Sequence, residues 1–165
     1  MTVSPVSVEC VIGPTSGRAG DVLLGELRSV RWTRFTAIAA FARMSGVKHL
    51  ERPIRNFIAA GGRADLTAGV DMRGTTYEAV WYLMNAVAPR GRLLLASAEP
   101  GATFHPKIYI FSNARSTVPN PVQALENASD ALVMIGSSNF TEGGLYVNDE
   151  SSLVWRPRFS EADEA

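Results

Sequence analysis

FHPKIYIF (104–111) and ALVMIGSSNFTEGGLYVNDE (131–150) are the two stretches that decide the fold of this chain. Each joins a run of apolar residues to a short polar motif, with H-P-K before the first run and G-S-S-N after the second. Short apolar runs rich in Val, Ile and aromatic residues are typical of buried strands. The sequence therefore predicts two strands, each of which carries polar side chains at one end.

Apolar patterns outside these two stretches alternate between lengths that suit strands and lengths that suit helices. We expect strands at 6–13, 35–43, 64–72, 92–98, 107–111, 131–136 and 151–156, and helices over 20–32, before Gly61-Gly62, and over 75–87. The order β-α-β-α-β-α-β followed by three strands predicts an α/β fold with a mixed β-sheet sandwiched by helices. Residues 112–130 are polar and contain prolines, so we expect a surface loop there.

Two of the helices carry more detailed expectations. Pro53 is expected in the first turn of the helix that stops at Gly61-Gly62, because proline is tolerated there. In the helix over 75–87, Thr75 or Thr76 is expected to cap the N-terminus. Its apolar residues recur at helical spacing, which predicts that they form the buried face. These residues are Tyr77, Val80, Trp81, Met84 and Val87.

The composition of the 165-residue chain indicates one globular domain of ordinary size. It has 16 Lys plus Arg and 16 Asp plus Glu, two His and one Cys, which excludes a disulfide framework and a multi-Cys zinc cluster. Cys10 is expected to be a small buried residue. No apolar run approaches the roughly 18 residues of a membrane span. We expect a single domain at 1–158, an acidic tail at 159–165 and a cytoplasmic location.

The polar motifs suit the chemistry of a phosphate group. His105 and Lys107 lie two residues apart, so a strand would present both side chains on the same face. Lysine supplies positive charge, and histidine attacks phosphorus or moves a proton. Ser137 and Asn139 add hydroxyl and amide donors, with Ser137 a better candidate for a phosphate contact than Ser138. Glu150 would hold the second imidazole nitrogen and fix the tautomer.

Taken together, these segments resemble the phospholipase D superfamily, which is marked by an H-x-K motif followed by G-S-x-N on a neighbouring strand. The family signature has Asp five positions after the lysine, where this chain has Ser112. That departure, with N-x-E after GSSN, is similar to the branch that contains restriction endonucleases and helicase-attached nucleases. The resemblance implies catalysis without metal or other cofactor through a phosphohistidine. A single H-x-K copy implies a homodimer that combines two half-sites across a two-fold axis.

The resemblance implies a metal-independent phosphodiesterase, most simply a DNA nuclease acting on single- or double-stranded DNA. His105, Lys107, Asn139 and Glu150 would be the catalytic residues, and Lys107, Ser137 and Asn139 would bind the scissile phosphate. A helicase or translocase ATPase partner in a restriction or antiphage defence system is the context expected by resemblance, with no membrane partner. Two alternatives stay open, which are a phospholipase D-type lipid hydrolase or transferase and a non-catalytic assembly module.

Overall fold

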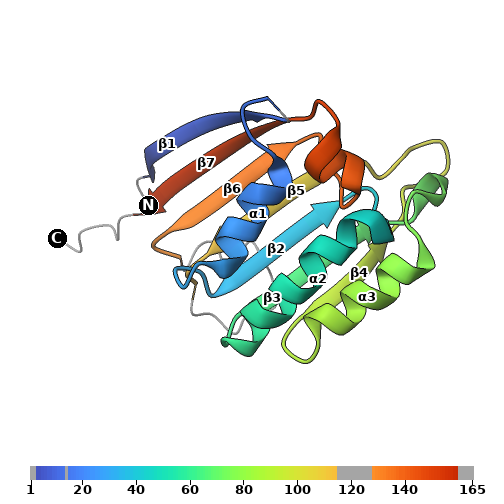
Figure 1. Ribbon diagram of the computed structural model, residues 1–165, viewed down its shortest axis with the longest axis horizontal. Coiled ribbons are helices and arrows are strands. Elements are labelled where there is room, and N and C mark those ends of the chain that lie inside the picture. The colour runs from blue at the N-terminus through green and yellow to red at the C-terminus, as the bar shows by residue number, and fades with distance from the viewer. Residues whose placement is uncertain (1–2, 14, 115–127, 160–165) are drawn as a thin grey trace.

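The computed structural model describes residues 3–13, 15–114 and 128–159, which form one seven-stranded sheet with helices (Figure 1). The strands are β1 (Val3–Ile12), β2 (Arg34–Ala39), β3 (Arg63–Gly69), β4 (Arg92–Ala96), β5 (Lys107–Ser112), β6 (Ala131–Gly136) and β7 (Ser151–Phe159). The helices are α1 (Ala19–Arg28), α2 (Met44–Ala59) and α3 (Tyr77–Val87), with a 3-10 turn η1 (Asp71–Arg73) and a π turn η2 (Gly143–Val147). The strand order across the sheet is β1-β7-β6-β5-β2-β3-β4.

The strand directions bring the loops that carry the polar motifs to one edge of the sheet. Strands β2, β3 and β4 are parallel, while β5, β6, β7 and β1 pair antiparallel to their neighbours. The C-terminal ends of β2, β3, β4 and β6 and the N-terminal ends of β5 and β7 therefore meet at the same edge. Helices α1, α2 and α3 also begin there. We call this the site edge.

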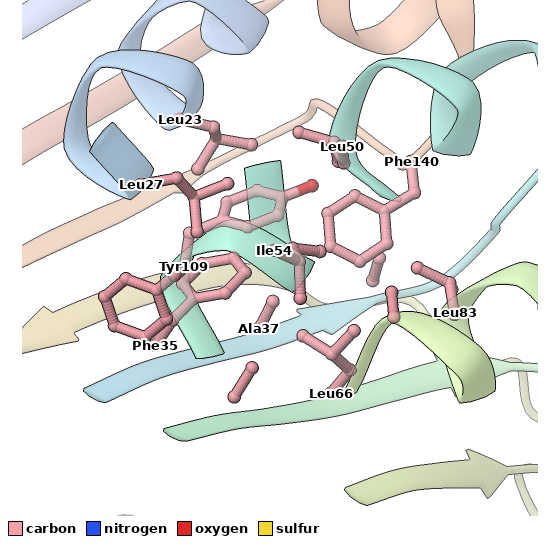
Figure 2. Packing of buried hydrophobic residues seen from close by; sticks show 14 of the residues in the cluster. Leu23, Leu27, Phe35, Ala37, Leu50, Ile54, Leu66, Leu83, Tyr109 and Phe140 are labelled. Atoms are coloured by element: carbon pink, nitrogen blue, oxygen red, sulfur yellow. The ribbon is translucent and has the colours of Figure 1, made fainter. Parts of the chain in front are cut away.

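Helices α1, α2 and α3 cover the same face of the sheet (Figure 1), and the main core lies between them and the strands. The register places Ala37, Leu66 and Tyr109 side by side on that face. Leu23 and Leu27 of α1 and Leu50 and Ile54 of α2 pack down on this row (Figure 2). At roughly 25 cal/mol per Å² of buried apolar surface, this layer is the main stabilising term for the fold.

The expected α/β class and the mixed sheet are confirmed, and all the expected strands and helices form. The expectation of helices on both faces differs from what the described residues show, because α1, α2 and α3 share one face. Most of the expected loop at 112–130 and nearly all of the acidic tail lie outside the described residues. None of the helices in the described ranges is both long and apolar enough to cross a membrane.

The expected place of Pro53 in α2 is wrong. The helix begins at Met44, so Pro53 lies in its interior. The helix tolerates this because its apolar stripe, which includes Leu50, Ile54 and Phe57, is buried against the sheet. The free energy gained by this burial is larger than the cost of one lost helical hydrogen bond. The expected stop is confirmed, since Gly61 adopts a φ of +100° and the Gly62 N–H donates to the Phe57 carbonyl at 3.0 Å.

The expected buried face of α3 is also largely wrong. The residues that contact the core are Ala79, Leu83, Ala86 and Val87, of which only Val87 was expected. Tyr77, Trp81 and Met84 are exposed, with Trp81 retaining 48% of its accessible surface. The two alanines let α3 approach the sheet and α2 closely, which a face of large aromatic residues would prevent. Thr76 caps the helix by accepting from the Ala79 N–H at 3.3 Å. Cys10, expected to be buried, is exposed on β1.

Candidate active site at the edge of the sheet

His105 and Lys107 lie in direct contact at the site edge. His105 is exposed in the loop before β5, and Lys107, the first residue of β5, retains only 6% of its accessible surface. The Lys107 Nζ lies 2.7 Å from Nδ1 and 3.0 Å from Nε2 of His105, and it donates to the His105 carbonyl at 2.8 Å. The structure therefore brings the imidazole and the ammonium together, with the imidazole on the solvent side.

Burial lowers the pKa of Lys107, while the negative charge of Glu150 acts in the opposite direction. An ammonium that is partly stripped of water is attracted more strongly to an anion than a fully hydrated one. The arrangement therefore makes Lys107 a strong partner for a phosphate that enters beside His105.

Asn139, the last residue of GSSN, ties this loop to the loop that follows β2. Its Oδ1 accepts a hydrogen bond from the Phe41 N–H at 3.0 Å. The backbone continues the connection, because the Phe140 N–H donates to the Phe41 carbonyl at 3.0 Å and the Arg43 N–H to the Phe140 carbonyl at 2.9 Å. With its oxygen engaged, Asn139 has its side-chain NH2 left as the donor. A phosphate oxygen requires a donor of this kind.

The two serines of GSSN have different surroundings. Ser137 is exposed, and its Oγ accepts from the Ser151 N–H at 3.1 Å and lies 3.4 Å from the Ser151 carbonyl. Ser138 is 1% exposed, and its carbonyl accepts from the Tyr109 hydroxyl at 2.6 Å. Within the described ranges, no hydrogen bond joins the Ser137 hydroxyl to His105, Lys107 or Asn139. Its visible role is to fasten the end of β6 to the start of β7.

Glu150 lies near Lys107 without a hydrogen bond to His105 among the described residues. Its Oε1 accepts from the Asn148 side chain at 3.4 Å, and its backbone carbonyl accepts from the Gly13 N–H at 2.9 Å. Its charge raises the pKa of Lys107 and adds to the increase that burial causes in the pKa of Tyr109. The structure thus couples Glu150 to the site through Lys107, and the expected contact with the imidazole stays a prediction.

Asp71 is a site residue that the sequence reasoning missed. Its Oδ2 accepts from the Phe104 N–H at 2.6 Å and from the Ala98 N–H at 3.1 Å, so one carboxylate holds the segment that leads to His105. Asp71 begins the turn η1, in which Met72 and Arg73 both adopt a φ of +54°. This conformation is uncommon for residues with a side chain and is often found near functional sites.

Close packing around Phe41 connects three loops at the site edge. A Cβ on Gly74 would lie 1.9 Å from Phe41 Cδ1, so only glycine leaves room for this ring. The ring meets His105 edge-on, with centroids 5.8 Å apart and planes at 73°. Thr75 Oγ1 donates to the Gly69 carbonyl at 2.5 Å and accepts from the Ala42 N–H at 2.9 Å. The loops after β2 and β3 therefore support one side of the imidazole.

Two exposed arginines lie at the site edge where helices begin. Arg18 and Arg43 are the exposed N-cap residues of α1 and α2, and neither makes a side-chain capping bond. The N-terminus of a helix favours negative charge, because its first N–H groups are unpaired and its dipole is positive there. No group of three or more His, Cys, Asp or Glu in the described part of the chain is placed to hold a metal ion. The donors gathered at this edge suit a phosphate.

Ser112, which stands where the family signature has Asp, lies far from these residues. It is the last residue of β5 and pairs with Arg34, whereas Lys107 is the first residue of β5 and pairs with Ala39 at the site edge. Ser112 is buried, and its carbonyl accepts from the Thr33 N–H at 3.0 Å. The departure from the signature therefore does not remove a side chain from the site edge.

No protein-family model matches the sequence, and no curated protein matches it. Solved structures do. NucT from Helicobacter pylori is similar with a TM-score of 0.64 at 12% identity, over 90% of this chain and 84% of that one. The phospholipase D family member Nuc from Salmonella typhimurium is similar with a TM-score of 0.59 at 21% identity, over 92% and 83%. Yeast tyrosyl-DNA phosphodiesterase matches with a TM-score of 0.53 at 11% identity, over 91% of this chain and 31% of that one.

Proposed function

From the phospholipase D fold of this chain, we propose that it is a phosphodiesterase that cleaves DNA without a metal ion. The observation that carries the proposal is the contact of 2.7 Å between His105 and Lys107 at an edge where three helices begin. A structural neighbour is named as a tyrosyl-DNA phosphodiesterase, which supports DNA as the substrate. The chemistry of the site edge fits this substrate, because the Lys107 ammonium and the N-termini of helices favour the negative charge of a phosphate.

The proposed reaction has two steps. A ring nitrogen of His105 forms a bond to phosphorus while the bond from phosphorus to the leaving oxygen breaks, and a second histidine gives that oxygen a proton. A water molecule then displaces the histidine from phosphorus and gives up its proton to the second histidine. Lys107 and the Asn139 side-chain NH2 neutralise and hold the phosphate oxygens, with Ser137 as a third contact, and Glu150 acts on His105 directly or through Lys107.

The second histidine is proposed to come from another copy of the chain. The only other histidine in the sequence is His49, which packs edge-on against Tyr146 and lies 3.5 Å from Glu142. Exposed apolar side chains lie at the site edge in the segments beside the motifs, namely Val70, Met72, Tyr77 and Val147. A two-fold axis through this edge would cover these side chains and bring two copies of His105 together.

The first experiment is cleavage of labelled single- and double-stranded DNA in EDTA by wild type, His105→Ala and His49→Ala. We expect His49→Ala to retain cleavage, because His49 lies outside the proposed catalytic residues, and His105→Ala to be inactive. Cleavage that requires an added metal ion, or that persists in His105→Ala, would contradict the proposed mechanism. An ATPase partner, a role in restriction or antiphage defence and a cytoplasmic location remain part of this proposal.

A phospholipase D-type lipid activity is the second candidate, and the exposed apolar residues at the site edge favour it. Met72 retains 77% and Tyr77 79% of their accessible surface. Such side chains could enter a lipid surface as well as a dimer interface. Release of head groups from phosphatidylcholine vesicles, measured beside DNA cleavage with the same protein, decides between the two candidates.

A further inference from the structure

A groove of about 750 Å³ lies between α1 and α2 and is lined by none of the proposed site residues. One wall comes from the C-terminal end of α1 and the segment to Thr33, and the other from α2 between Lys48 and Ala60. Its volume is in the range of sites that bind small molecules or pieces of larger ones.

The groove carries a surplus of positive charge. Arg28, Lys48 and Arg52 line it together with His49, and none of its lining residues is acidic. Lys48 is paired with Glu142 at 2.8 Å. Arg28 and Arg52 are exposed, and neither makes an ion pair with any residue in the described ranges. Two permanent cations are therefore available to an anionic ligand.

The floor of the groove is apolar and fixed. Trp32 and Phe57 line it and are each 4% exposed. The Trp32 indole N–H donates to Glu26 at 2.6 Å, which holds the ring in place. Pro53 also lines the groove and has no N–H, so the His49 carbonyl cannot receive the usual helical bond from residue 53. The groove thus offers cations, an acceptor and an apolar surface together.

The groove runs along α2 from Lys48 toward the C-terminal end of that helix. Arg43 caps that helix at the site edge, and a rise of about 1.5 Å per residue places Arg52 roughly 14 Å further along. Glu142 lies at the boundary. It follows Asn139 by three residues, and it contacts both Lys48 and His49 of the groove wall. A ligand held at the site edge could therefore extend into the groove.

We infer that this groove binds the phosphate backbone of a single DNA strand beyond the bond that is cleaved, an inference that rests on the proposed function. Cations spread along a helix suit a chain of phosphates better than one compact anion. The apolar part of the lining, which includes the exposed Val30, suits contact with the sugars and bases of an unpaired strand without sequence preference.

The test measures binding by fluorescence anisotropy of a labelled 30-residue oligothymidylate in the His105→Ala background, which prevents turnover. Arg52→Glu and Arg28→Glu are compared with Arg55→Glu. Arg55 lies on the same helix, is also exposed, and is outside the groove, where it pairs with Glu51 at 3.1 Å. We expect each groove variant to weaken binding about tenfold. The slope of log affinity against log salt concentration should fall by about the amount that one phosphate contact contributes. Arg55→Glu should change affinity by less than about twofold.

Equal weakening by Arg52→Glu and Arg55→Glu would overturn the inference, because it would indicate general electrostatics only. Displacement of the DNA by polyglutamate as readily as by unlabelled DNA of equal charge would overturn the assignment to nucleic acid. The two proposals fail separately. If wild type cleaves DNA while Arg52→Glu binds DNA as tightly as Arg55→Glu does, only the proposed role of the groove is refuted. If Arg52→Glu loses DNA binding while Arg55→Glu does not, and wild type does not cleave DNA, DNA binding in the groove is supported and the proposed activity is refuted.

Discussion

Lys107 combines burial with a place in the proposed chemistry. It contacts both ring nitrogens of His105, and the charge of Glu150 opposes the decrease in its pKa that burial causes. Because the pKa in the folded chain is lower than in the unfolded chain, the unfolded chain binds more protons between the two values. In that alkaline window the contribution of Lys107 to stability therefore rises with pH.

The same pKa predicts the alkaline limit of activity. If the Lys107 ammonium holds the phosphate, kcat/KM falls as Lys107 loses its proton, below the ordinary lysine pKa of about 10.4. Glu150→Gln removes the charge that raises this pKa, so we expect the alkaline limb to move to lower pH. The measurement is the pH profile of kcat/KM on a short single-stranded substrate. Asp149→Asn, at the exposed neighbouring position, is the control, and an unmoved limb in Glu150→Gln would refute the coupling.

Asp71 is expected to position His105 from a distance. Asp71→Ala removes two charge-assisted hydrogen bonds to the Ala98 and Phe104 N–H groups. We expect the free energy of unfolding to fall by about 2 kcal/mol, because two partly buried N–H groups lose their acceptor. We expect kcat to fall about tenfold with little change in KM, since misplacement affects the reaction more than phosphate binding.

Asp71→Asn is the matching test for Asp71, because an amide oxygen can still accept these bonds and should restore much of kcat. Glu99→Ala changes an exposed carboxylate in the same segment and should leave both quantities unchanged. A loss of stability in Asp71→Ala without any loss of kcat would show that Asp71 is structural only.

At the scale of elements, two helical glycines should respond in opposite directions to alanine. A Cβ on Gly46 of α2 would lie 2.6 Å from the backbone of Phe140, whereas a Cβ on Gly25 of α1 meets nothing within 4 Å. We expect Gly25→Ala to stabilise the chain by about 0.5–1 kcal/mol through helix propensity. Gly46→Ala should destabilise it, because Phe140 belongs to the loop that carries Asn139.

Urea unfolding measures both glycine variants, and DNA cleavage by Gly46→Ala under folding conditions reports on the loop. Equal effects of the two substitutions on stability would contradict the close packing of α2 on the segment after GSSN.

The strands and the two motifs could be predicted from the sequence because each is a local pattern. An apolar run followed by GSSN, or preceded by HPK, lies within a few residues. Asp71 could not be predicted in this way, since its partner Phe104 is 33 residues away. The buried face of α3 was misjudged because helical spacing does not by itself show which apolar stripe faces the core, while close approach to α2 and the sheet selects Ala79 and Ala86.

At the scale of the whole molecule, the proposed homodimer makes a quantitative prediction. If each site needs His105 from both copies, mixing wild type with His105→Ala under conditions of subunit exchange produces mixed dimers that are inactive. We expect DNA cleavage to fall as the square of the wild-type fraction. Sedimentation of each preparation establishes the oligomeric state. A linear decrease would indicate that one copy of the chain is sufficient.

The pairing of the first strand with the last has a consequence for protein engineering. Strand β1 runs antiparallel to β7, so Val3 lies opposite Phe159 while Ile12 lies opposite Ser151 at the site edge. Residues 3 and 159 are therefore neighbours at the end of the sheet away from His105, where β1 begins and β7 ends in Figure 1. A reporter or tether fused beside either residue would emerge from the same pole of the molecule. Surface immobilisation through that pole would leave the opposite edge facing the solution.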